Sequence, residues 1–241
     1  MKLVKIKKLN FSVIIPTLNE EKYLGKCLKS VMSMNYPKSD YEVIVVDGNS
    51  EDKTREIARK YGAKVIVSKI RRCGYQRQLG VNQARGELLS FIDADYVVDK
   101  NLLNGLEEIF NDKKVTAVQG KILLYDATFL ENLIGADIFN MFLWALVPLG
   151  LFATGGNMAI RKSVIDKIGG FNLIKKTAED IELLKKARKY GSVAYGAKAL
   201  GWTSTRRIRK WGYAKTLSFQ ISNLIRYTFT GKSCGEYEDL R

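Results

Sequence analysis

The chain has 241 residues, 46% of them hydrophobic, and its 40 Lys and Arg against 25 Asp and Glu give a net charge of +15. This length and composition fit one large globular domain and argue against disorder. Without a single histidine, any acid–base or metal chemistry must rest mainly on Asp and Glu. The three cysteines are widely spaced and odd in number, which argues against a disulfide framework or a zinc site and favours a reducing compartment.

The first half of the chain alternates short β-rich runs with helical patterns. We expect strands over 11–15, 42–46, 64–67 and 88–92, and helices over 20–32, 52–61, 74–84 and 100–110. The apolar run 11–15 ends at Pro16 and is too short for the core of a signal peptide. Alternation with short links predicts an α/β fold with a doubly wound, mostly parallel sheet, in which ligands bind at the carboxyl ends of the strands.

The second half is less regular. We expect a strand over 116–124, a very apolar helix over 129–147, a Gly-rich turn into a strand over 154–160 and a helix over 178–190. After the basic stretch 206–211, the apolar spacing of Leu217, Ile221, Leu224, Ile225 and Thr228 predicts an amphipathic helix.

Carboxylates follow three of the expected strands, in the segments 16–21, 47–52 and 93–95. In the last of these, Asp93 and Asp95 are spaced by one residue and can hold a divalent cation that also binds a diphosphate. The alternative is a turn with two solvated acids. Asp47 could face a ligand while Ser50 or Asp52 caps the next helix, and the two interpretations are compatible.

Two further motifs have a simple structural interpretation. Glu179 and Asp180 open an expected helix, where acids complement the helix dipole. The run Gly155-Gly156-Asn157 could be only a turn.

Taken together, these motifs resemble glycosyltransferase family 2, the inverting nucleotide-sugar enzymes of the GT-A fold. The resemblance lies in Pro16-Thr-Leu-Asn-Glu-Glu, Val45-Val-Asp-Gly-Asn-Ser-x-Asp-x-Thr and Phe91-Ile-Asp-Ala-Asp, in that order, and extends to Gly155-Gly-Asn and Glu179-Asp180. It covers roughly residues 11 to 200. It implies transfer of a sugar from a nucleotide diphosphate, UDP rather than GDP, with Mn or Mg as the cation.

The resemblance also implies roles for single residues. Asp180 would be the catalytic base, with Glu179 beside it, and Asp93 and Asp95 would lie at the metal. The remaining donor-site residues would be Pro16, Thr17, Glu20, Asp47, Arg71 and Arg77, and the acceptor site would include Gly155, Gly156 and Asn157. We expect one catalytic domain over 1–205, with its nucleotide-sugar half over 10–98 and its acceptor half over 99–205, followed by a basic amphipathic extension over 206–241.

The segment 138–153 is almost wholly apolar but too short and too broken to span a bilayer comfortably. It is either a core helix that is apolar on all sides or an interfacial helix that touches a bilayer or a lipid-linked acceptor. The basic stretch 206–215 would suit an anionic headgroup layer. We therefore predict a peripheral enzyme on the cytoplasmic membrane face, with a polyprenyl-phosphate or other lipid-linked acceptor.

Two other functions would use the basic surface. A nucleotidyltransferase usually has a Gly-rich basic loop after its first strand, whereas this chain has Pro16-Thr-Leu-Asn-Glu-Glu. A nucleic-acid-binding protein would fit the net charge, but the acids cluster where a nucleic-acid groove would need cations. We therefore expect a nucleotide-sugar donor as the partner, and no nucleic acid.

Overall fold

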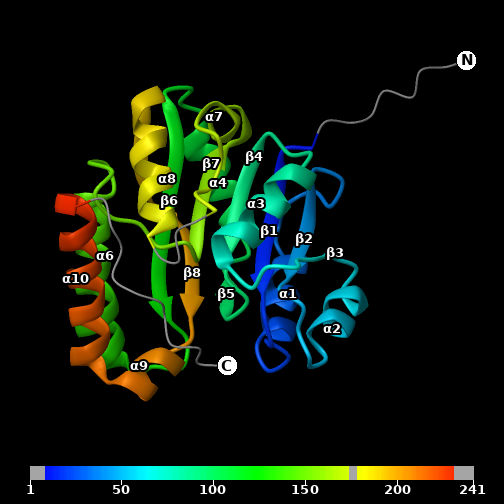
Figure 1. Cartoon of the computed structure of the whole chain (residues 1–241), viewed down its shortest axis with the longest axis horizontal. Coiled ribbons are helices and arrows are strands. Elements are labelled where there is room, and N and C mark those ends of the chain that lie inside the picture. The colour runs from blue at the N-terminus through cyan, green and yellow to red at the C-terminus, as the bar shows by residue number, and fades with distance from the viewer. Residues whose placement is uncertain (1–8, 174–177, 231–241) are drawn as a thin grey trace, which may run out of the picture.

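The computed structural model describes residues 9–173 and 178–230. Its eight strands form one sheet in the order β3-β2-β1-β4-β7-β6-β8-β5 (Figure 1). The strands are β1 (Phe11–Thr17), β2 (Tyr41–Asp47), β3 (Lys64–Val67), β4 (Leu88–Ile92), β5 (Tyr96–Val98), β6 (Val115–Leu124), β7 (Asn157–Arg161) and β8 (Ser192–Thr203).

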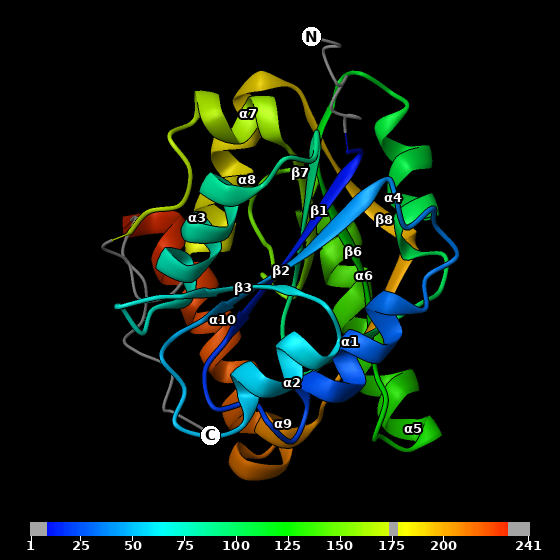
Figure 2. The ribbon, with the colours of Figure 1, turned by 90° about the vertical axis from the view of Figure 1, so that its right-hand side faces the viewer.

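Helices flank the sheet. They are α1 (Leu24–Met32), α2 (Thr54–Lys60), α3 (Cys73–Gln83), α4 (Leu102–Phe110), α5 (Phe129–Glu131), α6 (Asp137–Leu146), α7 (Lys162–Lys167), α8 (Glu179–Ala187), α9 (Arg206–Trp211) and α10 (Tyr213–Thr230). A π-helical turn, η1 (Asn132–Ala136), joins α5 to α6, and a 3₁₀ turn, η2 (Arg188–Tyr190), follows α8. Figure 2 shows α3 and α8 on one face of the sheet and α1 and α4 on the other.

The predicted strands of the first half are confirmed as a parallel set. β1 pairs in parallel with both β2 and β4, and β2 pairs in parallel with β3. Phe11, Ile14 and Ile15 of β1 are fully buried, as expected for a strand that is covered on both faces. The pairing of β1 with β4 ends at Ile14, so Pro16, which has no N–H, costs the sheet no hydrogen bond there.

The second half adds antiparallel pairs, so the whole sheet is mixed. β7 runs antiparallel to both of its neighbours, β4 and β6, while β8 pairs in parallel with β6 and antiparallel with β5. This second set of strands continues the sheet beyond β4 and brings the segment after β8 back to the carboxyl ends of β1 and β4. The doubly wound α/β prediction therefore describes the first half best.

Close packing of α3 on β1 positions part of the site. A Cβ at Gly80 of α3 would lie 2.4 Å from the Ile14 side chain, so glycine is needed for this approach. The same helix carries Gln76 and Arg77, both 3% exposed, toward the ends of the strands. Packing against the strand thus fixes two polar side chains that lie near the candidate site.

The predicted helix 129–147 is α5, η1 and α6, and two asparagines attach it to the edge of β6. Asn140 accepts a hydrogen bond from Ile122 N (3.0 Å) and donates to Ile122 O, while Asn132 does the same at Leu124, with both distances 2.9 Å. These side-chain amides take the place of a neighbouring strand. They explain why polar residues interrupt an otherwise apolar segment.

The outer face of this segment is apolar and exposed, so it is not a helix buried on all sides. Its exposed large apolar side chains are Phe129, Leu130, Leu133, Ile138, Met141, Phe142 and Trp144, and Leu149 is exposed just after it. Nowhere in the described ranges is a helix both long enough and apolar enough to pass through a membrane.

The predicted C-terminal helix lies within α10, but its amphipathic character stays a prediction. Ile221 and Ile225 are exposed, whereas the side chains of Leu217, Leu224 and Thr228 lie outside the described ones. Residues 231–241 of the predicted extension also lie outside the described ranges.

Candidate functional site

The loop after β2 is organised around the buried carboxylate of Asp47. This carboxylate accepts hydrogen bonds from the Ser50 N–H (2.9 Å), the Ser50 hydroxyl and the Thr17 hydroxyl (3.3 Å). Gln76 of α3 links the ends of β1 and β2, because its side-chain amide donates to Thr17 O and Val46 O. The ends of β1 and β2 are therefore held in a fixed relation at the edge where a nucleotide would bind.

Arg77 joins two of the predicted site acids. Its guanidinium, 3% exposed, lies 2.8 Å from Asp93 Oδ1 through Nη2 and 2.8 Å from Glu179 Oε1 through Nη1. Gly155 leaves the space for this side chain, since a Cβ there would lie 2.1 Å from Arg77 Nη2. Residues far apart in the sequence thus converge on one buried cation.

Glu179 and Asp180 begin α8 directly after Ala178, whose φ of 62° is a left-handed conformation that costs an L-residue about 1 kcal/mol. Burial, together with the negative charge of Asp180, raises the pKa of Glu179 to about 7. Burial likewise raises the pKa of Asp180, against the opposing effect of the Arg77 charge. A carboxyl with a pKa near 7, such as that of Glu179, can accept or release a proton near neutral pH.

Arg206, the first residue of α9, lies against two other acids of the site. Its Nη1 and Nη2 are each 2.8 Å from the Glu20 carboxylate, and its Nε is 3.0 Å from Asp95 Oδ2. The guanidinium also lies 4.7 Å from the centre of the Tyr23 ring. Burial raises the pKa of Asp95 to about 6, and the charge of Arg206 opposes this rise.

Gly156 and Asn157 connect the strands that support the site. A Cβ at Gly156 would lie 2.5 Å from the Tyr96 ring. Asn157 is 1% exposed, and its amide donates to Lys121 O (3.0 Å) and Ala199 O (2.9 Å). The Asn157 amide therefore links β7 to β6 and β8, and Gly156 leaves space for the Tyr96 ring of β5.

The structure brings most of the predicted residues to one edge of the sheet. Pro16 lies within β1 and is buried, whereas Arg71 is exposed and pairs with Glu51 at 2.7 Å. Sequence reasoning did not single out Gln76, Tyr96 or Arg206. Arg206 was visible only as part of a basic run, because nothing local indicates that it reaches Glu20.

The acids at the strand ends fit a divalent cation that is shared with a substrate. Across the described ranges, no three Asp, Glu or Cys side chains form a complete metal site. A magnesium-type ion usually takes only one or two carboxylates and completes its shell with phosphate oxygens and water. Asp95 and Glu20 offer such hard oxygens, and the Arg206 guanidinium between them shows that this point accepts a cation.

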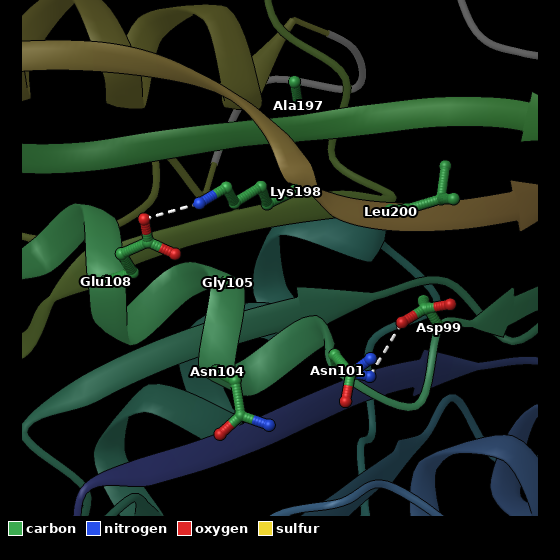
Figure 3. A pocket seen from close by; sticks show the side chains of 8 residues that line it. All are labelled: Asp99, Asn101, Asn104, Gly105, Glu108, Ala197, Lys198 and Leu200. Atoms are coloured by element: carbon green, nitrogen blue, oxygen red, sulfur yellow. Dashed lines mark hydrogen bonds and ion pairs between the residues drawn. The ribbon is translucent and has the colours of Figure 1, made fainter.

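A cavity of about 400 Å³ lies elsewhere, between α4 and β8 (Figure 3). Its lining residues are Asp99, Asn101, Asn104, Gly105, Glu108, Ala197, Lys198 and Leu200, and the Lys198–Glu108 ion pair lies along it. None of the predicted site residues is among them. We therefore place the candidate site at the strand ends and not in this cavity.

The sequence matches the model of a known protein family. The family model "Glycosyl transferase family 2" matches residues 12–179, which contain every motif quoted above up to Glu179. The chain belongs to glycosyltransferase family 2. "Probable glycosyltransferase YdaM" of Bacillus subtilis is 30% identical over 215 residues, which are 79% of this chain and 50% of that protein. "Beta-monoglucosyldiacylglycerol synthase" of Nostoc is 28% identical over 178 residues, 67% of this chain and 37% of that protein. The chain thus spans half or less of the length of these relatives.

Solved structures show the same GT-A fold. S. aureus TarS 1-349 in complex with UDP superposes with a TM-score of 0.68 at 20% identity, over 92% of this chain and 73% of that one. Mannosyltransferase PcManGT from Pyrobaculum calidifontis, in complex with GDP-Man and Mn²⁺, superposes with a TM-score of 0.70 at 20% identity, over 88% of this chain and 64% of that one.

Proposed function

We propose that this family 2 protein is an inverting glycosyltransferase that moves a sugar from a nucleotide diphosphate, UDP rather than GDP, to an acceptor hydroxyl or phosphate. The single observation that carries the proposal is the convergence of Asp93, Asp95 and Glu179 at one sheet edge through two arginines, Arg77 and Arg206. Carboxylates beside buried cations suit a substrate that is both charged and metal-bound.

In this proposal Asp180 removes the proton from the acceptor. An inverting transfer needs a base on the acceptor side of the anomeric carbon, opposite the leaving diphosphate. Glu179 holds Arg77 with one oxygen, and Arg77 in turn holds Asp93, so the base lies next to a network that reaches the donor side. The raised pKa of Asp180 supports this role, because a more basic carboxylate accepts a proton more readily.

The donor would lie over the ends of β1, β2 and β4. In this proposal the buried pair Thr17 and Asp47 would shape the end that takes the base, and Asp93 and Asp95 would lie at the end that takes the diphosphate. Bound Mn²⁺ or Mg²⁺ would supply charge neutralisation for the leaving diphosphate. The Mn²⁺ in the PcManGT complex and the UDP in the TarS complex support a metal and a nucleotide diphosphate as the ligands.

For the acceptor we propose a lipid-linked molecule that is met at an anionic bilayer. Phe129 is 83% exposed, Leu130 60% and Trp144 66%, and no Lys or Arg occurs between Lys121 and Arg161. Two contacts hold the basic helix α9 and the start of α10 near this apolar face. Arg209 of α9 donates to the carbonyl of Asp126, just before α5, and the hydroxyl of Tyr213, the first residue of α10, donates to Glu131 of α5 at 2.9 Å. Figure 2 shows α5 and α9 at the same end of the molecule.

An apolar face beside cations suits a membrane interface, where acyl chains lie next to anionic headgroups. The diacylglycerol named for the Nostoc relative supports a lipid acceptor. That the protein works on the cytoplasmic membrane face stays a prediction from the sequence.

The test is a screen of UDP- and GDP-sugars for hydrolysis and transfer with Mn²⁺ or Mg²⁺, with and without a polyprenyl-phosphate acceptor. Asp95→Asn and Asp180→Asn are compared with wild type. We expect one donor to turn over with metal, and both variants to lose at least about 100-fold in rate. Glu56→Gln, an exposed change on α2, should keep the wild-type rate. Binding of no nucleotide sugar by the folded protein would contradict the proposal.

A further inference from the structure

Arg206 occupies a position that a divalent cation would be expected to use. Both of its terminal nitrogens contact Glu20, and its Nε contacts Asp95. The side chains of Glu20 and Asp95 are 4% and 15% exposed, so water compensates little of their charge. One guanidinium therefore contacts two poorly solvated carboxylates, one in the segment after β1 and one in the segment after β4.

A divalent cation and Arg206 would contact the same two carboxylates. Arg206 brings one positive charge to Glu20 and Asp95, and the charge of Arg207 also acts on Asp95, whereas a divalent ion would bring two charges to both acids at once. An ion placed between Glu20 and Asp95 would also repel the adjacent guanidinium, since like charges a few ångströms apart in a poorly solvated site destabilise each other. The arginine and the ion are thus alternatives at the same carboxylates.

The backbone around Arg206 does not depend on these ion pairs. Asp126 accepts hydrogen bonds from Thr205 N (2.7 Å) and the Ser204 hydroxyl (3.1 Å), and Ser204 Oγ accepts one from Arg206 N (3.2 Å). The start of α9 therefore stays anchored when the Arg206 side chain changes its partner. Its guanidinium, 21% exposed, lies at the surface side of the two acids.

We propose that Arg206 and a divalent cation compete for Glu20 and Asp95, so that Arg206 sets how tightly the donor site takes metal. This inference rests on the proposed donor site but goes beyond it. It assigns to Arg206, which lies outside the three sequence motifs, the role of weakening metal binding. It also gives a role to the contact of Arg206, a residue late in the chain, with two acids of the expected metal site.

The experiment measures Mn²⁺ binding without nucleotide, by calorimetry and by the electron paramagnetic resonance signal of free Mn²⁺. Arg206→Gln removes the competing charge, so its Kd for Mn²⁺ should be at least tenfold lower than that of wild type. Mn²⁺ should also raise the melting temperature of Arg206→Gln by more than it raises that of wild type. An unchanged or weaker affinity in Arg206→Gln overturns the proposal.

Two further variants make the result specific. Lys210→Gln removes one charge from an exposed position on the same helix and should leave the Kd within about twofold of wild type. Should Arg206→Gln fail to fold, Arg206→Lys keeps the charge but loses the two-pronged contact with Glu20. It should then bind Mn²⁺ at least threefold more tightly than wild type, and equal or weaker binding again overturns the proposal.

Asp95→Asn separates this inference from the proposed function. If Asp95→Asn abolishes Mn²⁺ binding while Arg206→Gln leaves it unchanged, the competition is wrong and the metal assignment stands. If sugar transfer proceeds in wild type but neither Asp95→Asn nor Arg206→Gln alters Mn²⁺ binding, the metal lies elsewhere and the competition is again wrong.

Discussion

At the residue scale, the site depends on glycines as much as on charged groups. Gly155 matters because Arg77 fills the volume that any side chain there would need. The motif Gly155-Gly156-Asn157 was visible in the sequence, but its local pattern indicates only a turn. Its contact with a cation on α3 is set by the packing of two distant segments, which no local pattern encodes.

We expect Gly155→Ala to displace Arg77 from Asp93 and Glu179 and to lower the free energy of unfolding by about 3 kcal/mol, since it breaks buried ion pairs. Gly25→Ala is the matched control. It lies in α1 with its nearest contact at 3.9 Å and should be neutral or slightly stabilising. Urea unfolding of both variants checks this, and equal midpoints for the two would contradict it.

The raised pKa of Glu179 predicts how stability depends on pH. A carboxyl whose pKa is higher in the folded protein contributes stability that is fully present below its unfolded value and is lost as the pH rises through about 7. The free energy of unfolding should therefore fall between pH 4.5 and 7. Glu179→Gln should make this fall shallower by at least about 1 kcal/mol, because it removes one titrating group.

Thermal melts from pH 4.5 to 8 measure this slope. Glu56→Gln, at an exposed position on α2, is expected to keep the wild-type slope. A Glu179→Gln protein with an unchanged slope would show that another group is responsible for the loss.

At the element scale, the sequence predicted the strands of the parallel half well because their runs are continuously apolar. It missed β8, where Ala, Gly and Lys replace the usual β-branched residues. Gly196 and Gly201 lie where β8 is closely packed, since a Cβ would lie 2.9 Å from the Ile109 side chain at the first and 3.2 Å from the Asn157 side chain at the second. β8 is thus a strand because of its long-range pairing with β6, and its own propensity does not indicate it.

The attachment of α6 to β6 can be tested at Asn140. Asn140→Ala leaves the N–H and C=O of Ile122 without their present partner and should destabilise the fold by about 2–3 kcal/mol. Hydrogen exchange over 119–124 should rise with it. Asn82→Ala, at an exposed position on α3, should cost less than about 0.5 kcal/mol. Wild-type stability of Asn140→Ala would show that the Asn–β6 contacts contribute nothing.

At the scale of the whole molecule, the exposed apolar face predicts vesicle binding. The protein should float with vesicles that contain anionic phospholipid, and Phe129→Ser with Leu130→Ser should weaken this at least tenfold, since each side chain is worth about 1.5–3 kcal/mol when buried. Val67→Ser, on the far edge strand and 46% exposed, is the control. Equal flotation of all variants would contradict the prediction. A dimer that the same double variant dissociates would show instead that a second copy covers the face.

That the candidate donor residues lie near one another was predictable from the sequence because they belong to segments at the ends of parallel strands. Asp47 and Asp93 stand directly after apolar runs, Asp95 follows two residues later, and parallel pairing of β1 with β2 and β4 brings such positions together. Arg206 was not predictable in the same way. Its place depends on how β8 returns across the sheet, and that depends on pairings between segments of unremarkable sequence.

The pairing of Glu20 with Arg206 joins residues that are 186 positions apart. On the ribosome the acids of the first strands are therefore made early, and the cation that balances them is made late. Until α9 emerges, a nascent chain carries the carboxylates of Glu20 and Asp95 without Arg206. Repulsion between the two carboxylates then works against closing this edge of the sheet. We therefore expect this part of the candidate site to close only after the segment that follows β8 has been synthesised.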